Sequence, residues 1–85
     1  MKQSEKNKLK KDLALALIYL CSWEEKELST VVRRAWKGYD FDVLDQLQEE
    51  DLISFSYKAK SLYISEEGIK KAGELVEKFG AHFSV

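Results

Sequence analysis

The expected fold is decided by residues 36–53, which read WKGYDFDVLDQLQEEDLI. Asp40 is a good helix N-cap, because its carboxylate can accept a hydrogen bond from a free backbone N–H in the first turn. Apolar residues follow this cap at helical spacing. Those expected to face the core are Phe41, Leu44 and Leu47. The stretch therefore predicts a helix that starts at Asp40 and ends near Asp51.

The residues before this stretch predict another helix and a tight turn. Ser22 and Glu25 fit the S-x-x-E capping box, in which each side chain satisfies a free backbone N–H. The apolar residues that follow at helical spacing are Leu28, Val31, Val32, Ala35 and Trp36. Gly38 occupies the position where many helices end in the left-handed conformation. We therefore expect a positive φ at Gly38, and expect Gly38→Val to destabilise the domain by more than ~1 kcal/mol.

Two interpretations of residues 36–42 follow from this pattern. In the structural one, Trp36 and Phe41 fill the core while Gly38 and Asp40 make the turn, and Tyr39 packs against the next helix. In the functional one, the aromatic side chains form a recognition platform. The structural interpretation is favoured, because every residue then has a local role.

The start of the chain predicts a first helix that is apolar on most sides. Its inward stripe is expected at Leu9, Leu13, Ala16, Leu17 and Leu20. A helix of this kind is usually sandwiched between others. Residues 1–8 are polar and are expected to be a frayed or disordered lead. Cys21 ends the apolar run and is expected to be buried and inert.

The second half of the chain predicts a hairpin and a final helix. Ile53, Phe55 and Tyr57 alternate with serines, and Leu62 and Ile64 alternate after a short basic link. Ser65 is the expected cap of the last helix, and the inward stripe of that helix is expected at Ile69, Ala72, Val76 and Phe79. Residues 81–85 are expected to be a tail. Leu75 and Phe83 lie off or beyond the stripe, which predicts a homodimer burying about 1,200 Å² or more.

The fold class predicted by this order is α+β, of the winged helix-turn-helix type. It consists of three helices, a two-stranded β-hairpin wing and a C-terminal helix, within one domain over residues 9–80. The pattern is similar to that of bacterial winged-helix regulators. The first strand of the full winged-helix fold, between helices one and two, is not evident in the sequence.

A closer resemblance rests on three short motifs. They are Trp36-Lys37-Gly38-Tyr39-Asp40-Phe41-Asp42, Lys58-Ala59-Lys60-Ser61 and Ser65-Glu66-Glu67-Gly68. The chain resembles, over roughly residues 13–79, a bacterial domain-of-unknown-function family with a Trp-Lys-Gly-Tyr-Asp signature. The resemblance implies that this chain is related to that family, and it implies no particular activity.

The composition of the chain limits the functions that can be expected of it. The 85 residues carry a formal charge of −1 and a single cysteine, so neither a bulk attraction to nucleic acid nor a disulfide framework is expected. The longest apolar run is far shorter than the ~20 residues of a membrane span. No residues are predicted to be catalytic or to bind a cofactor or metal, and no small-molecule substrate is evident. We therefore expect a cytoplasmic protein that is not an enzyme and does not bind membranes.

The distribution of charge separates two binding functions. Six acids and no Lys or Arg lie between Gly38 and Tyr57, on the helix that would enter the major groove of DNA. The basic residues able to contact nucleic acid or a partner are Arg33, Arg34, Lys37, Lys58 and Lys60. Because carboxylates repel phosphates, we expect an interaction domain that binds protein or itself. The alternative is a DNA-binding regulator that contacts phosphates through helix two and the wing.

Overall fold

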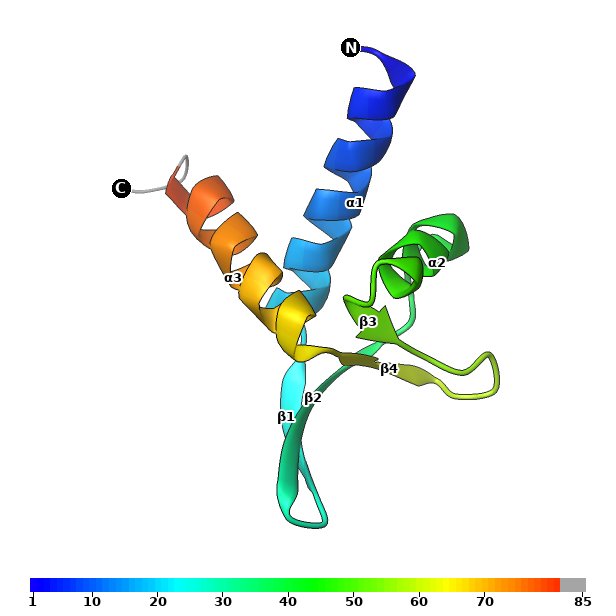
Figure 1. Cartoon of the computed structure of the whole chain (residues 1–85), viewed down its shortest axis with the longest axis vertical. Coiled ribbons are helices and arrows are strands. Elements are labelled where there is room, and N and C mark those ends of the chain that lie inside the picture. The colour runs from blue at the N-terminus through cyan, green and yellow to red at the C-terminus, as the bar shows by residue number, and fades with distance from the viewer. Residues whose placement is uncertain (82–85) are drawn as a thin grey trace.

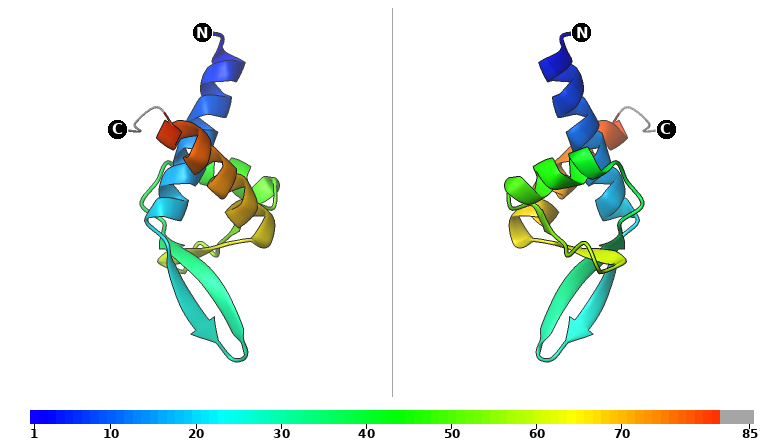
Figure 2. Two further views of the ribbon diagram at one scale, coloured as in Figure 1. Left: turned by 90° about the vertical axis from the view of Figure 1, so that its left-hand side faces the viewer. Right: turned by 90° about the vertical axis from the view of Figure 1, so that its right-hand side faces the viewer.

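Three helices lie on one side of a four-stranded antiparallel sheet in the computed structural model, which describes residues 1–81 (Figure 1). The elements in chain order are α1 (Gln3–Leu20), β1 (Trp23–Glu27), β2 (Thr30–Trp36), α2 (Phe41–Glu49), β3 (Ile53–Ser54), β4 (Ser61–Ile64) and α3 (Glu66–Gly80). The strands are arranged in the order β1-β2-β4-β3. Figure 2 shows the β1–β2 hairpin and the N-terminal half of α1 projecting from opposite ends. The fold is therefore α+β, as the sequence predicts.

The segment predicted as the second helix is instead the β1–β2 hairpin. Glu24 pairs with Arg33 and Glu25 with Val32, and the ladder ends at the turn formed by Leu28 and Ser29. The β-branched run at residues 30–32 favours a strand, and cross-strand charge pairs stabilise it. Leu28 is 98% exposed and has a φ of 55°, so its expected inward position is wrong.

The predicted capping box at Ser22 is also wrong, for the same reason. The Ser22 hydroxyl donates to the carbonyl of Tyr19 at 2.5 Å and accepts from Nη1 of Arg33 at 2.9 Å. Ser22 therefore closes α1 and anchors the hairpin. Since no helix precedes α2 directly, the winged helix-turn-helix assignment is not confirmed.

The second hairpin forms where it was expected, but with shorter strands. β3 and β4 pair antiparallel, with Ile53 opposite Ile64. The backbone N–H of Phe55 donates to the side chain of Gln48 at 2.7 Å, so the chain leaves the ladder after Ser54. β4 also pairs with β2, with Ala35 opposite Leu62. These strands thus belong to the larger sheet and do not form a separate two-stranded wing.

The two helix caps in this half of the chain are confirmed. The Asp40 carboxylate accepts from the N–H of Asp42 at 2.8 Å. The Ser65 hydroxyl accepts from the N–H of Gly68 at 2.9 Å. Leu44 and Leu47 are buried as predicted, whereas Phe41 is 56% exposed. The local signals therefore fix where these helices start.

The predicted turn at Gly38 does not have the predicted conformation. Among the described residues no glycine has a positive φ, and a Cβ built on Gly38 meets no atom within 4 Å. The element that ends before Gly38 is the strand β2 and not a helix. A chain that leaves a strand in an extended conformation needs no residue in the left-handed conformation. The basis for a costly Gly38→Val change is therefore lost.

The core lies between the helices and the sheet, and of the stripe predicted to face inward on α1 only Ala16 is buried in it. The buried residues of α1 are Leu15, Ala16 and Ile18, whereas Leu9, Leu13, Leu17 and Leu20 are exposed. α1 begins at Gln3 and includes most of the segment that was expected to be frayed. Cys21 is exposed, contrary to prediction.

The last helix follows the predicted stripe only in part. Ala72 is fully buried, while Ile69, Val76 and Phe79 are partly buried against the core. Leu75 belongs to the buried core, so its predicted role as leftover apolar surface is wrong. Phe83 and most of the predicted tail lie outside the described residues.

Gly68 provides a test of this packing. A Cβ on Gly68 would lie 2.0 Å from the carbonyl oxygen of Leu52 and 2.9 Å from Cγ2 of Ile64. We expect Gly68→Ala to destabilise the fold by about 1–3 kcal/mol, because backbone must move to admit the methyl group. Urea denaturation followed by circular dichroism measures the free energy of unfolding.

Gly73 is the matched control on the same helix. A Cβ there meets no atom within 4 Å. Gly73→Ala should therefore stabilise by roughly 0.5–1 kcal/mol through helix propensity alone. Equal effects of the two substitutions would contradict the close approach of α3 to the carbonyl of Leu52.

Candidate functional site

The side of the sheet that faces away from the helices carries a cluster of aromatic and charged side chains. Trp23 pairs with Arg34, and Arg34 pairs with Tyr63, so these three side chains point to the same side. The neighbouring Ala35 is fully buried toward the helices, which places Arg34 on the opposite side. We call this cluster the aromatic face, and its members are Trp23, Glu25, Glu27, Arg34, Trp36 and Tyr63.

Arg34 is the centre of the aromatic face. Its Nη1 lies 3.3 Å from a carboxylate oxygen of Glu25 and 3.6 Å from one of Glu27. Its Nη2 donates to the hydroxyl of Ser61, and its guanidinium carbon lies 4.8 Å from the ring centroid of Tyr63. Two carboxylates therefore outweigh the charge of this arginine, and the aromatic face has no excess of positive charge.

The tryptophans extend the aromatic face toward one edge of the sheet. The rings of Trp23 and Trp36 lie 4.9 Å apart at an interplanar angle of 47°, and Nε1 of Trp23 donates to Glu25 at 3.3 Å. Trp36 is 62% exposed, so the prediction that it fills the core is wrong. The cause is the strand: alternation along β2 turns Ala35 inward and Trp36 outward.

Three tyrosine hydroxyls have a pKa above the usual value for tyrosine. A hydrogen bond to Glu27 at 3.0 Å raises the pKa of Tyr63, and a hydrogen bond to Asp45 raises the pKa of Tyr57. Burial, together with the neighbouring Cys21, raises the pKa of Tyr39. Of the three, Tyr57 and Tyr63 donate hydrogen bonds to carboxylates.

The basic residues predicted to contact nucleic acid or a partner do not gather on one surface. Arg33 lies on the helix side of the sheet, where it pairs with Glu24 at 2.9 Å and lies over the ring of Tyr19. Arg34 lies on the other side. Lys37 donates to the carbonyl of Ser56 at 2.7 Å and lies 4.8 Å from the ring centroid of Phe55.

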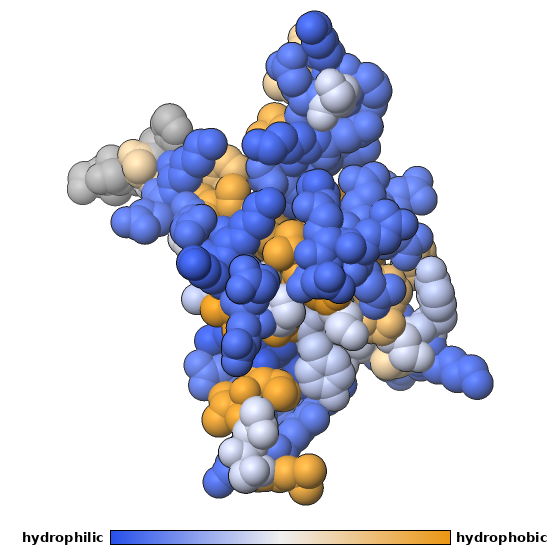
Figure 3. All heavy atoms as spheres, viewed as in Figure 1, coloured by the Kyte–Doolittle hydropathy of each residue, from blue (hydrophilic) through white to orange (hydrophobic). Residues whose placement is uncertain are grey.

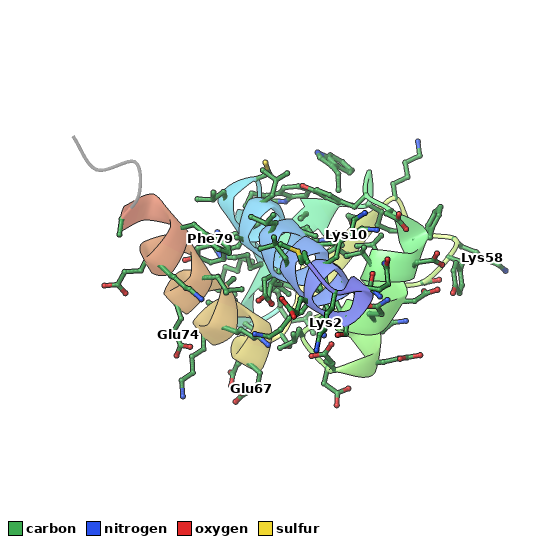
Figure 4. All side chains as sticks on the ribbon, turned by 90° about the horizontal axis from the view of Figure 1, so that it is seen from above. Lys2, Lys10, Lys58, Glu67, Glu74 and Phe79 are labelled. Carbon is green, nitrogen blue, oxygen red and sulfur yellow. The ribbon has the colours of Figure 1, made fainter. Side chains whose placement is uncertain are left out.

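The other two predicted basic residues lie in the loop between β3 and β4. Lys58 and Lys60 are both exposed, and Figure 4 shows Lys58 pointing away from the body of the molecule. They share this part of the surface with Lys37, because the N–H of Lys37 donates to the carbonyl of Lys60 at 3.2 Å. The five predicted residues are thus split among three locations.

Sequence reasoning missed the members of the aromatic face on β1 and β4. The sequence of β1, Trp-Glu-Glu-Lys-Glu, has no apolar–polar alternation that would predict a strand or the side on which Trp23, Glu25 and Glu27 lie. Tyr63 lies between the buried Leu62 and Ile64, so the alternation of side chains along β4 could have predicted that Tyr63 is exposed.

The described residues form a polar pocket but no cluster of metal-binding side chains. No three His, Cys, Asp or Glu side chains among residues 1–81 gather as a metal site. A polar pocket of about 310 Å³ lies between α1 and α2, lined by Lys10, Asp40, Asp42 and Asp45 among others. None of the helices over residues 1–81 is long and apolar enough to cross a membrane.

The Arg34 cluster can be tested by removing its cation. We expect Arg34→Met to destabilise the domain by about 1–3 kcal/mol, because Glu25 and Glu27 would then lie close together without a partner. Lys26→Met on the exposed side of β1 is the control and should change stability by less than about 0.5 kcal/mol. Denaturant unfolding of both variants measures the difference, and equal stabilities would contradict a structural role for Arg34.

Comparison with known proteins shows to which proteins this chain is related. The family described as "Domain of unknown function (DUF6429)" matches residues 6–82. An uncharacterized protein of Sinorhizobium fredii, y4hR, is 38% identical over 65 residues, which cover 75% of this chain and 78% of that protein. No solved structure matches. The kinship that the sequence motifs indicated is confirmed: the chain belongs to the DUF6429 family of domains of unknown function.

Proposed function

We propose that this chain is a non-enzymatic interaction domain that binds a protein partner through the aromatic face. The observation that carries the proposal is the exposure of Trp36, at 62%, beside a rigid cluster centred on Arg34. No helix among the described residues covers this side of the sheet (Figure 1). Apart from its contact with Trp23, the exposed part of the Trp36 ring adds nothing to the hydrophobic stabilisation of the folded domain.

The composition of the aromatic face suits a protein partner. Trp, Tyr and Arg are the residue types most enriched at the energetic centres of protein interfaces. Nε1 of Trp23 and the hydroxyl of Tyr63 already have partners, since they donate to Glu25 and Glu27, whereas Nε of Arg34 is buried without one among residues 1–81. A partner can therefore cover the rings of Trp23 and Tyr63 without leaving these two donors unsatisfied.

The same contacts prearrange the aromatic face. The guanidinium of Arg34 lies over the ring of Tyr63, and its Nη1 contacts the carboxylates of both Glu25 and Glu27. Immobilising a side chain on binding costs about 0.5–1.5 kcal/mol, and a side chain that is already fixed avoids most of that cost. This supports recognition by a surface that changes little when the partner binds.

The charge arrangement disfavours the alternative of a winged-helix-like DNA-binding regulator. Arg33 and Arg34 would have to leave Glu24 and Glu25 before they could contact phosphates. On α2, Asp42 and Glu49 are exposed, which would oppose entry of that helix into the major groove. Lys58 and Lys60 remain available, but two lysines support only weak, salt-sensitive binding.

The protein-binding proposal is tested with Trp36→Ala, which removes an exposed ring. We expect this variant to lose a partner that the unchanged chain captures from a cell extract, and Leu28→Ala, at the exposed hairpin tip, to retain that partner. The captured protein is then purified, and its affinity is measured by calorimetry. Hot-spot aromatics typically cost 2 kcal/mol or more when truncated, so we expect an affinity loss of about thirtyfold or more for Trp36→Ala. Equal affinities of the two variants would contradict binding through the aromatic face.

The DNA-binding alternative is tested by fluorescence anisotropy with random and genomic duplexes over a salt series. We expect no sequence-selective binding, and non-specific binding weaker than about 10 μM at physiological salt. Submicromolar, sequence-selective binding would overturn the proposal. In that case replacing Arg33, Arg34 and Lys60 by Ala should lower the affinity and flatten its salt dependence.

A further inference from the structure

We propose that a second copy of this chain pairs antiparallel with the free edge of β1, so that the two sheets become one. β1 is an outer strand of the sheet, and its hairpin projects from the body of the molecule (Figure 2). The opposite edge is closed to such pairing, because β3 has two residues and the N–H of Phe55 after it donates to Gln48. β1, with five residues, is the edge that another strand can use.

The register of the β1–β2 hairpin determines which backbone groups of β1 point to its free edge. Glu27 and Thr30 pair across a two-residue turn, so each donates to the other and accepts from it. Because the two kinds of pair alternate along an antiparallel ladder, the N–H and C=O groups of Glu24 and Lys26 point away from β2. Among residues 1–81, none of the backbone hydrogen bonds outside the helices and ladders involves these groups. They are therefore open to a further strand.

One antiparallel register uses all of these groups and also pairs opposite charges. With a twofold axis at Glu25, Glu24 of each copy lies opposite Lys26 of the other, and the same contact forms twice. The side chains of Glu24 and Lys26 are both exposed and lie on the same side of the sheet. Arg33 contacts Oε1 of Glu24 at 2.9 Å, which leaves Oε2 for the lysine of the other copy. This complementarity identifies the occupant of the edge as a second copy.

The carboxylates on the other side of β1 are drawn away from this edge. In the proposed register Glu25 faces Glu25 of the other copy, and Glu27 faces Trp23. Both carboxylates contact Arg34 on β2 through Oε2, and Glu27 also accepts from the hydroxyl of Tyr63 on β4. Each Glu25 therefore meets its counterpart beside two guanidinium groups, which offset the repulsion between the carboxylates.

The turn of the hairpin provides an independent observation. Leu28 is 98% exposed and has a φ of 55°, at a turn position where glycine or asparagine is favoured. Within the domain this leucine buries almost no surface and adopts a conformation that costs energy. Figure 3 shows hydrophobic side chains on the projecting hairpin. In the proposed register Leu28 lies level with Ser22 of the other copy, at the end of α1, where Leu20 is 63% exposed.

Sedimentation velocity on the full chain, from low micromolar to millimolar concentration, tests whether a second copy binds. Two five-residue strands bury less surface than a standard interface, so we expect a dimer that forms toward the upper end of this range. Amide hydrogen exchange locates the contact, because the N–H groups of Glu24 and Lys26 should exchange more slowly as the concentration rises. Trp36→Ala should dimerise like the unchanged chain, which separates this contact from partner binding through the aromatic face.

A proline substitution removes one outward N–H group. Lys26→Pro leaves the ladder with β2 intact, since the N–H of Lys26 points away from it. We expect this variant to stay monomeric at every concentration, with a circular dichroism spectrum like that of the unchanged chain. Lys26→Met retains the N–H and is the matched control. It should still dimerise, with a dissociation constant raised by no more than about tenfold.

A charge exchange tests the register. In Lys26→Glu and in Glu24→Lys like charges face each other twice, so each variant alone should dimerise at least about tenfold more weakly. An equimolar mixture of the two variants restores both pairs of opposite charges and should associate like the unchanged chain. Leu28→Gly should weaken the dimer without lowering the stability of the monomer, because glycine favours this φ.

Three results would each overturn the proposal. They are a chain that stays monomeric throughout, a dimer that Lys26→Pro leaves unchanged, and a mixture that associates no better than its two components. Slower exchange at Glu24 and Lys26 only after an extended peptide of another protein is added would overturn it as well.

Discussion

The ladder between β2 and β4 is the constraint on which the rest of the structure depends. Ala35 pairs with Leu62, and Arg33 with Ile64, which joins two hairpins that are each local in sequence. An isolated hairpin is at best marginally stable in water. Four paired strands that pack against a layer of helices form a stable structure. Because side chains alternate along a strand, this one register sets two surfaces at once. It turns Ala35, Leu62 and Ile64 toward the helices, and it turns Arg34, Trp36 and Tyr63 away from them.

The approach of α3 to the sheet follows from the same constraint. The hydroxyl of Ser65 caps α3 and donates to the carbonyl of Asp51 at 2.6 Å, and the N–H of Ser65 donates to the carbonyl of Leu52. These contacts bring the first turn of α3 against the carbonyl of Leu52, where only glycine fits at position 68. The end of α2, the start of β3 and the start of α3 are thus held at one point. α1 then packs over this layer and closes the core.

The proposed binding surface lies on the side of the sheet that the helices do not cover. Contacts inside the β1–β2 hairpin occupy both arginines of the chain, Arg33 and Arg34, which is the physical reason for favouring protein over nucleic acid.

The sequence by itself determined the features that depend on neighbouring residues. The caps at Asp40 and Ser65, the buried positions Leu44 and Leu47, and the antiparallel pairing of residues 53–54 with 63–64 all follow from local hydrogen bonding and short-range periodicity. The motif over residues 36–42 indicated that the chain is related to a bacterial family of domains of unknown function. None of these features needs information about distant contacts, because each is formed within a few turns or one loop.

Tertiary structure alone decided the features for which the local pattern was ambiguous. Residues 22–36 satisfy a helical spacing but also contain the β-branched run at residues 30–32, and pairing of β2 with β4 selects the strand. α1 is apolar on most sides, so only packing against the sheet chose Leu15 and Ile18 for the core and left Leu13 and Leu17 outside. Trp36 was placed in water for the same reason. The residues adjacent in sequence do not determine which side of a sheet the helices cover. That side is decided by tertiary packing, and it determines where the aromatic face of this protein lies.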